Sequence, residues 1–271
     1  VMIIPSLQLN DGYTIPQIGL GLWQNKDEAE FKQAFDAAIK AGYTHFDSAQ
    51  AYDNEQYLGA AMKNLRREEL FITTKIAVEH FGYNNARKSF QQSLKNLQTD
   101  YVDLLLLHFP VPILRKKSWQ ALEDIQKNGG AKSIGVSNYT IKHLEQMKDY
   151  AQVMPAVNQV ELHVFLQQPE LLKYCADHDI IVEAYSPLAH AKDMDNQLVK
   201  ELAATYKKSY AQIMLRWCLQ LGLVVLPKSV TPARIIENLD ILNFEISDAD
   251  MQKLQEQDRD LRTCWSPVHV P

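Results

Sequence analysis

Cysteine is scarce in this chain of 271 residues. Cys175, Cys218 and Cys264 are odd in number, lie far apart in the sequence and form no C-x-x-C pair. This pattern excludes a small disulfide-stapled scaffold and gives no sign of a zinc knuckle, so we expect no bound metal. It is typical of a protein kept in a reducing compartment, and we expect a cytoplasmic location.

Long apolar runs are missing as well. The longest, such as residues 104–107 and 223–226, are far shorter than the roughly 20 residues that cross a bilayer. Residues 1–5 lack the basic segment, apolar core and small-residue cleavage site of a secretory signal. We therefore expect a soluble protein that is neither secreted nor attached to a membrane.

An excess of positive charge is also absent. The chain has 28 Lys and Arg against 33 Asp and Glu, for a formal net charge of −5. Such a chain has no overall field to attract nucleic acid or anionic lipid, so an anionic ligand must be held by local basic residues. No linker rich in Pro, Gly or Ser divides the chain, so we expect one domain over residues 1–271. No repeat or coiled coil demands a partner, and a monomer is the default expectation.

What the sequence does contain is a recurring pattern: a short apolar run, then a longer stretch with apolar residues at helical spacing, about eight times. The apolar runs predict buried parallel strands at residues 18–22, 43–47, 70–75, 101–108, 132–137, 156–161, 180–185 and 223–226. The longer stretches predict helices at residues 27–41, 55–64, 86–97, 118–128, 141–150, 169–178, 197–221 (divided into two), 233–239 and, closing the chain, 248–258.

Local signals agree with this division. Residues 7–9 and 13–15 alternate in polarity around Asn10-Asp11-Gly12, which predicts an N-terminal β-hairpin. Gly42 is typical of a helix end. Four residues stand where helix N-caps belong, namely Asp27, Thr140, Thr231 and Ser247.

Alternating strands and helices are compatible with a doubly wound open sheet or with a closed barrel. The segment Gly19-Leu20-Gly21-Leu22-Trp23-Gln24 has Gln24 where the pyrophosphate loop of an open dinucleotide-binding sheet needs a third glycine. The sequence therefore favours the α/β class and a (β/α)8 TIM barrel, with an N-terminal β-hairpin and an extra C-terminal helix.

Polar residues end several of the apolar runs, and in such a barrel these ends meet in the active site. Asp47 and Lys75 are expected to pair, because an unpaired buried charge is unfavourable. Lys75 is also expected to contact Tyr52 and lower the pKa of its phenol, which makes Tyr52 a usable proton donor. His108 ends the next strand and could hold a carbonyl oxygen beside that hydroxyl, an arrangement suited to carbonyl reduction.

Each of these residues alone is more often structural, as an ion pair, a core histidine or a loop aromatic. Their position at the tops of three consecutive strands favours a catalytic role. The sequence also resembles the aldo-keto reductases over nearly its whole length, from residue 15 to about 242, and especially the compact bacterial and protozoan members such as 2,5-diketo-gluconate reductases and prostaglandin F synthase-like enzymes. The matching blocks are Phe46-Asp47-Ser48-Ala49 with Tyr52 and Asn54-Glu55, Thr74-Lys75, residues 103–108 with Pro110, Ile134-Gly135-Val136-Ser137-Asn138, Asn158-Gln159-Val160-Glu161, Tyr185-Ser186-Pro187-Leu188 and Pro227-Lys228-Ser229.

The resemblance implies an NADPH-dependent barrel without a metal, whose catalytic residues are Asp47, Tyr52, Lys75 and His108. It also implies that Tyr185 stacks on the nicotinamide, and that the carboxamide is bound by Ser137, Asn138 and Gln159. The remaining cofactor contacts that it implies are Gly21, with Ser186 and Leu188 along the pyrophosphate and Glu237 and Asn238 near the adenine.

Two basic residues follow the last strand. Lys228 and Arg234 are placed to receive the 2′-phosphate of NADPH, together with Ser229 and Val230. The alternative interpretation of this cluster is a solvated helix start, capped by Thr231.

Departures from the family pattern concern the substrate. Trp23 and Phe109 are expected to line the substrate pocket, and Ala77 stands where an aromatic residue is frequent. The segments 109–117 and 189–195 are short, which predicts an open site. The tail over residues 262–271 either covers the pocket with Trp265 or is mobile.

The sequence thus predicts an NADPH-dependent reductase of aldehydes and small ketones, dicarbonyls such as methylglyoxal included, with Tyr52 as the proton donor. One alternative is a nucleotide-binding regulatory protein that keeps the fold and turns over poorly. A metal-dependent hydrolase on the same barrel is disfavoured, because the sequence contains neither H-x-H nor H-E-x-x-H.

Overall fold

The computed structural model describes residues 3–271, so Val1 and Met2 of the expected domain lie outside the described residues. Its main sheet has eight parallel strands in sequence order, and the first and last strands meet through bridges from Ile18 to Val225 and from Gly21 to Lys228. The predicted barrel is therefore confirmed. Its strands are β3 (Gly19–Gly21), β4 (His45–Asp47), β5 (Phe71–Ile76), β6 (Val102–Leu107), β7 (Ala131–Ser137), β8 (Val157–Glu161), β9 (Ile181–Tyr185) and β10 (Val224–Leu226).

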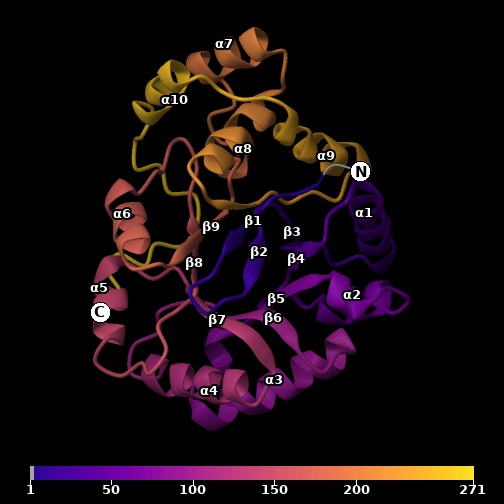
Figure 1. Ribbon diagram of the computed structural model, residues 1–271, viewed down its shortest axis with the longest axis vertical. Helices are drawn as coiled ribbons and strands as arrows, with labels where there is room; N and C mark the ends of the chain where they lie inside the picture. Colours follow the sequence, from indigo (N-terminus) through magenta and orange to yellow (C-terminus); the bar gives the residue numbers. More distant parts are fainter. Residues whose placement is uncertain (1–2) are drawn as a thin grey trace.

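Helices surround the barrel and cover the outer faces of its strands (Figure 1). Within residues 3–271 they are α1 (Glu28–Ala41), α2 (Glu55–Met62), α3 (Tyr83–Leu97), α4 (Arg115–Lys127), α5 (Ile141–Met147), α6 (Pro169–Asp177), α7 (Gln197–Tyr206), α8 (Tyr210–Gln220), α9 (Pro232–Leu239) and α10 (Asp248–Gln255). Every predicted helix is present. The main differences are that α3 and α4 each begin three residues early and that α5 and α10 each end three residues early.

The capping signals account for most of the helix boundaries. The side chain of Asp27 accepts a hydrogen bond from the backbone N–H of Glu30, and Gly42 takes a left-handed conformation (φ 112°) at the end of α1. Thr140 and Ser247 cap α5 and α10 in the same way. The prediction for Thr231 is wrong in one respect: it occupies the N-cap position of α9, but its side chain makes no capping hydrogen bond.

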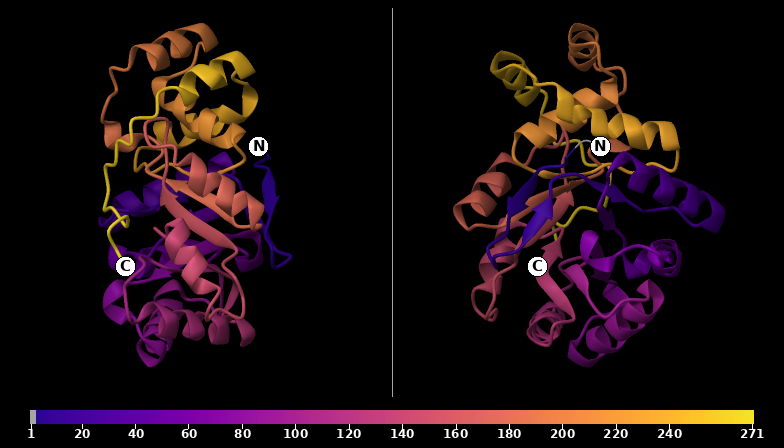
Figure 2. Two further views of the ribbon diagram at one scale, coloured as in Figure 1. Left: turned by 90° about the vertical axis from the view of Figure 1, so that its left-hand side faces the viewer. Right: turned by 45° about the vertical axis from the view of Figure 1, so that its right-hand side comes forward.

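The predicted hairpin is formed by β1 (Ser6–Gln8) and β2 (Thr14–Pro16), which pair antiparallel. Leu9 and Ile15 pack there against Phe71, Leu104 and other apolar side chains near the starts of the barrel strands. The hairpin therefore closes the amino-terminal end of the barrel. Figure 2 shows the hairpin and the C-terminal tail on opposite sides of the molecule.

The barrel interior changes from apolar to polar along the strands. Side chains at alternate strand positions point inward, so Thr73 and Lys75 of β5 follow Phe71 on the same face. The buried polar side chains of this upper layer are His45, Asp47, Thr73, Lys75, Gln159 and Glu183. Buried polar groups must find partners, so this layer organises the site described below.

None of the helices among residues 3–271 combines the length and apolar character that a bilayer crossing requires.

Candidate active site

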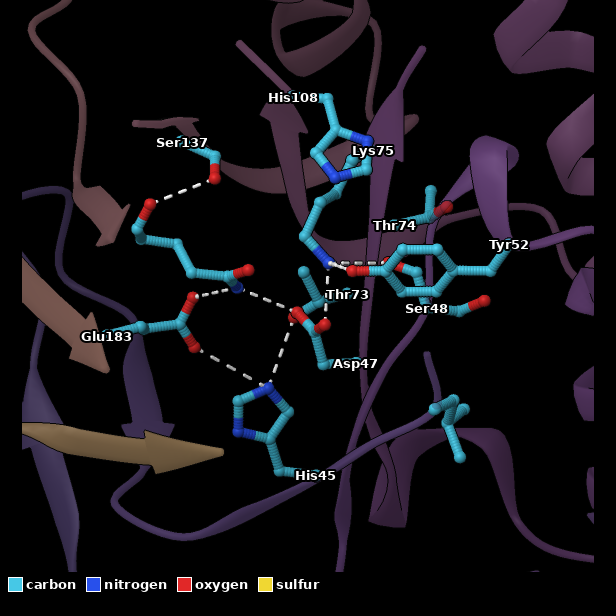
Figure 3. Close-up of polar contacts among 12 residues, drawn as sticks. His45, Asp47, Ser48, Tyr52, Thr73, Thr74, Lys75, His108, Ser137 and Glu183 are labelled. Atoms are coloured by element: carbon cyan, nitrogen blue, oxygen red, sulfur yellow. Dashed lines mark hydrogen bonds and ion pairs between the residues drawn. The ribbon is translucent and has the colours of Figure 1, made fainter. Parts of the chain in front are cut away.

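Lys75 is the centre of a polar cluster at the carboxyl ends of the barrel strands (Figure 3). Its side chain is fully buried. The ammonium Nζ donates hydrogen bonds to Asp47 Oδ1 at 2.6 Å, to the carbonyl oxygen of Ser48 at 2.9 Å and to the Tyr52 hydroxyl at 3.4 Å. Tyr52 comes from a 3-10 turn (Gln50–Tyr52) just after β4. The structure thus brings together the three residues that the sequence predicted to pair.

The residues around Lys75 determine its protonation state, and Lys75 in turn affects that of Tyr52. Burial disfavours the ammonium of Lys75, but Asp47 and Tyr52 outweigh it, so the pKa of Lys75 is raised and the ammonium persists. The expectation that Lys75 brings the pKa of Tyr52 below its ordinary value is wrong in this structure. Burial raises the pKa of Tyr52, and Lys75 offsets only part of that effect. Tyr52 therefore remains a protonated phenol at neutral pH.

His108 follows β6 and lies beside Tyr52, with their ring centroids 5.7 Å apart in an edge-on arrangement. Burial, together with the nearby ammonium of Lys75, lowers the pKa of His108 to about 3. Its imidazole is therefore neutral at physiological pH. A neutral imidazole can donate a hydrogen bond through its N–H but is a much weaker acid than imidazolium, which leaves Tyr52 as the better proton donor.

The four residues expected around the nicotinamide are joined by hydrogen bonds. The Tyr185 hydroxyl donates to Asn138 Oδ1 at 2.7 Å, and Asn138 Nδ2 donates to Ser137 Oγ at 3.1 Å. Asn138 Nδ2 also donates to the carbonyl oxygen of His108 at 3.1 Å. Ser137 Oγ donates to the carbonyl oxygen of Gln159 at 2.9 Å. These residues therefore form one connected patch that borders His108.

The residues expected at the phosphate end lie at the seam between β10 and β3 and at the start of α9. Gly21 donates its N–H to the Pro227 carbonyl at 3.0 Å, which fixes the two strands side by side. Lys228 and Arg234 are exposed, and neither has an acidic partner in the described part of the chain. The N-terminal turn of α9 adds backbone N–H groups, which favour an anion. The adjoining positions are Ser229 (buried), Val230 and Glu237 (half-buried) and Asn238 (buried).

The pyrophosphate candidates lie on the segment that follows β9. Ser186 Oγ is within hydrogen-bond distance of His190 Nε2, at 2.8 Å, and of Cys264 Sγ, at 3.6 Å. Leu188 is half-buried and packs against the hydrophobic core. Ser186 thus connects the predicted cofactor residues with the C-terminal tail.

Two of the aromatic residues expected around the substrate are joined to other loops. Trp23 is 42% exposed and meets His190 edge-on, with ring centroids 5.3 Å apart. Phe109 meets Trp265 at 6.5 Å. Ala77 is buried and does not face open solvent. Trp265 itself is 80% exposed, so it borders Phe109 without filling a pocket.

The tail is held to the barrel by Glu161 at the end of β8. Glu161 Oε1 accepts hydrogen bonds from the N–H and hydroxyl of Thr263 at 2.7 and 2.5 Å, and Oε2 accepts one from the N–H of Cys264 at 3.0 Å. Burial opposes ionisation of Glu161, but these bonds and one from His163 lower its pKa to about 2. The structure therefore favours a tail anchored to the barrel over a mobile tail.

Sequence reasoning missed two buried residues beneath this cluster, His45 and Glu183. His45 stands two positions before Asp47 on β4, and Glu183 stands two positions before Tyr185 on β9. Residues two apart in a strand point to the same face, so both side chains point into the barrel. The signal was visible: Glu183 interrupts the apolar run Ile181-Val182-Glu183-Ala184.

Comparison with known proteins identifies the family. The aldo/keto reductase family model matches residues 17–259. The chain belongs to the aldo/keto reductase family. It is 42% identical to the glyoxal reductase of Bacillus subtilis over 97% of this chain and 96% of that protein, and 42% identical to the methylglyoxal reductase DkgA of Escherichia coli over 96% of each.

Solved structures of this family have the same fold. The crystal structure of an aldo-keto reductase from Bombyx mori in complex with NADP superposes with a TM-score of 0.91, at 32% identity, over 97% of this chain and 95% of that one. This aldo/keto reductase is thus an oxidoreductase, as predicted. The particular likeness to 2,5-diketo-gluconate reductases stays a prediction.

Proposed function

We propose that this reductase uses NADPH to reduce aldehydes and small ketones to alcohols, with dicarbonyls such as methylglyoxal among its substrates. One observation carries the proposal: the buried ammonium of Lys75 is shared between Asp47 Oδ1 and the Tyr52 hydroxyl. The names of the glyoxal and methylglyoxal reductases that it resembles support the substrate class.

The protein groups divide the chemistry between them. Bound NADPH supplies the hydride that goes to the carbonyl carbon. Tyr52 donates its phenolic proton to the carbonyl oxygen, and Lys75 stabilises the phenolate that remains. Asp47 holds Lys75 in place and keeps it charged. His108, neutral in this site, donates a hydrogen bond that aligns the oxygen with the Tyr52 hydroxyl.

The residues present fit the cofactor. Tyr185 offers a ring at the carboxyl end of β9, and the side-chain carbonyl oxygens of Asn138 and Gln159 offer acceptors for the amide N–H groups of a carboxamide. Lys228 and Arg234 offer unpaired cations for the 2′-phosphate, and Arg234 can bind phosphate with two donors. Their charge is the basis for preferring NADPH over NADH.

We further propose that the protein acts as a cytoplasmic monomer without a nucleic-acid partner. Cys175 and Cys218 are buried free thiols, which suits a reducing compartment. The net charge of −5 disfavours binding to a polyanion.

The test is consumption of NADPH and, separately, of NADH by the purified protein with methylglyoxal, an aromatic aldehyde, a keto-sugar and a quinone. Turnover that strongly favours NADPH supports the proposal. Tight NADPH binding with negligible turnover across the panel would instead indicate a regulatory nucleotide-binding protein.

A further inference from the structure

Glu183 is a buried carboxyl that the proposed chemistry does not use. It comes from β9 and pairs in register with Gln159 of β8. Gln159 Nε2 donates to Glu183 Oε2 at 2.9 Å and also to Asp47 Oδ2 at 2.8 Å. One amide group therefore joins Glu183 to the carboxylate that holds Lys75. In Figure 3, Glu183 and Tyr52 lie on opposite sides of Asp47.

His45 lies next to this carboxyl on the inner face of β4. His45 Nε2 is 3.2 Å from Thr73 Oγ1 and 3.8 Å from Glu183 Oε1. The space for its ring depends on Gly19, since a Cβ there would come within 2.7 Å of the imidazole. Burial lowers the pKa of His45 to about 4, so this neighbour is neutral at physiological pH.

Because His45 is neutral, Glu183 forms no ion pair with a charged side chain within residues 3–271. Among the described residues, Oε1 is buried without a hydrogen-bond partner, which is unfavourable for a carboxylate but acceptable for a protonated carboxyl. Burial, followed by repulsion from Asp47, raises the pKa of Glu183 to about 8. The polar groups around Glu183 come from three strands: His45 and Asp47 on β4, Thr73 and Lys75 on β5, and Gln159 on β8. Asp103 on β6 acts on His45. The apolar residue Val224 of β10 lies in register with Glu183.

We propose that Glu183 is a positioning residue for the carbonyl reduction: through Gln159 it fixes Asp47 against Lys75, and its ionisation adds a negative charge beneath the catalytic cluster. The inference rests on the proposed function. A second carboxylate next to Asp47 favours the phenol over the phenolate of Tyr52, because it partly cancels the field of Lys75. A weaker acid transfers its proton more slowly, so reduction should slow as Glu183 ionises.

The test compares wild type with Glu183→Gln, which keeps the shape and the acceptor for Gln159 but cannot ionise. We expect kcat with NADPH and methylglyoxal to agree within about twofold at pH 6, where the carboxyl is protonated. Between pH 7 and pH 9.5 the wild-type kcat should fall roughly tenfold further than that of the variant. Equal pH profiles would overturn the inference.

A matched control and a second readout separate this role from a structural one. Glu55 is also buried with a raised pKa, but it lies outside the barrel, where its carboxyl accepts hydrogen bonds from the side chains of Thr74 and Asn96. Glu55→Gln should therefore keep the wild-type dependence of kcat on pH.

The second readout is the stability of the fold. Because folding raises the pKa of Glu183, the contribution of this carboxyl to stability is lost as pH rises from about 4.5 to about 8. Glu183→Gln should remove that part of the pH dependence of urea unfolding, and an unchanged dependence would contradict the buried neutral carboxyl.

The same data distinguish failure of the inference from failure of the proposed function. Wild-type protein that reduces no carbonyl at any pH would refute the proposed function. Wild-type protein that turns over normally, with the same pH profile in Glu183→Gln, would refute the role of Glu183 alone.

Discussion

Replacing Lys75 by methionine should destabilise the fold as well as stop catalysis. The Lys75 side chain is fully buried and lies 2.6 Å from Asp47 Oδ1, so the substitution leaves a buried carboxylate whose remaining side-chain donor is Gln159. Removing one partner of a buried ion pair typically costs about 3–5 kcal/mol. Methionine is similar in length to lysine, so little of the loss should come from a cavity.

Urea unfolding followed by circular dichroism measures the loss. It compares the free energy of unfolding of Lys75→Met with that of wild type under the same conditions.

A double variant completes the test. Asp47→Asn with Lys75→Met removes both charges, so it should recover more than 1 kcal/mol relative to the sum of the single losses. Unfolding free energies of Lys75→Met within about 0.5 kcal/mol of wild type, or losses that simply add, would refute the reasoning that the two charges depend on each other.

Three further predictions concern the phosphate end, the tail and the barrel core. Lys228→Ala combined with Arg234→Ala should weaken NADPH binding by about 2–4 kcal/mol while leaving the NADH Kd unchanged, whereas Lys173→Ala with Lys200→Ala, which removes the same charge elsewhere, should affect neither. Glu161→Gln should increase proteolysis of residues 262–271. In wild type the protection by Glu161 should persist above pH 4.5 and fade as pH falls toward 2, since the pKa of Glu161 is lowered to about 2. Gly19→Ala should lower stability by about 1–3 kcal/mol in thermal unfolding, because its Cβ would meet the His45 ring at 2.7 Å; an unchanged Tm would count against the packing described.

The sequence predicted the barrel because its determinants are local. Each strand is a short apolar run, each helix has an amphipathic period, and Gln24 in place of a third glycine disfavoured the open sheet. Asp47, Lys75 and His108 could be placed together because parallel strands in a barrel end at the same face.

Other features depend on contacts that no local pattern encodes. Glu161 and Thr263 are 102 residues apart in sequence, and nothing in the spacing indicates that the tail is anchored to β8. The direction in which the pKa of Tyr52 shifts could not be predicted either, because the pKa depends on burial of the phenol as well as on its distance to Lys75. His45 and Glu183 were visible as polar residues in strands, but their hydrogen-bond partners come from other strands, Thr73 for His45 and Gln159 for Glu183.

The central claim is that Tyr52 donates the proton, and Tyr52→Phe tests it most directly. The substitution removes only the hydroxyl, whose bond to Lys75 Nζ is long at 3.4 Å, so the fold and the NADPH Kd should stay close to wild type. Loss of a general acid predicts a fall in kcat with methylglyoxal of about 10²–10⁴-fold. A variant that binds NADPH normally and retains more than about a tenth of wild-type turnover would contradict the account.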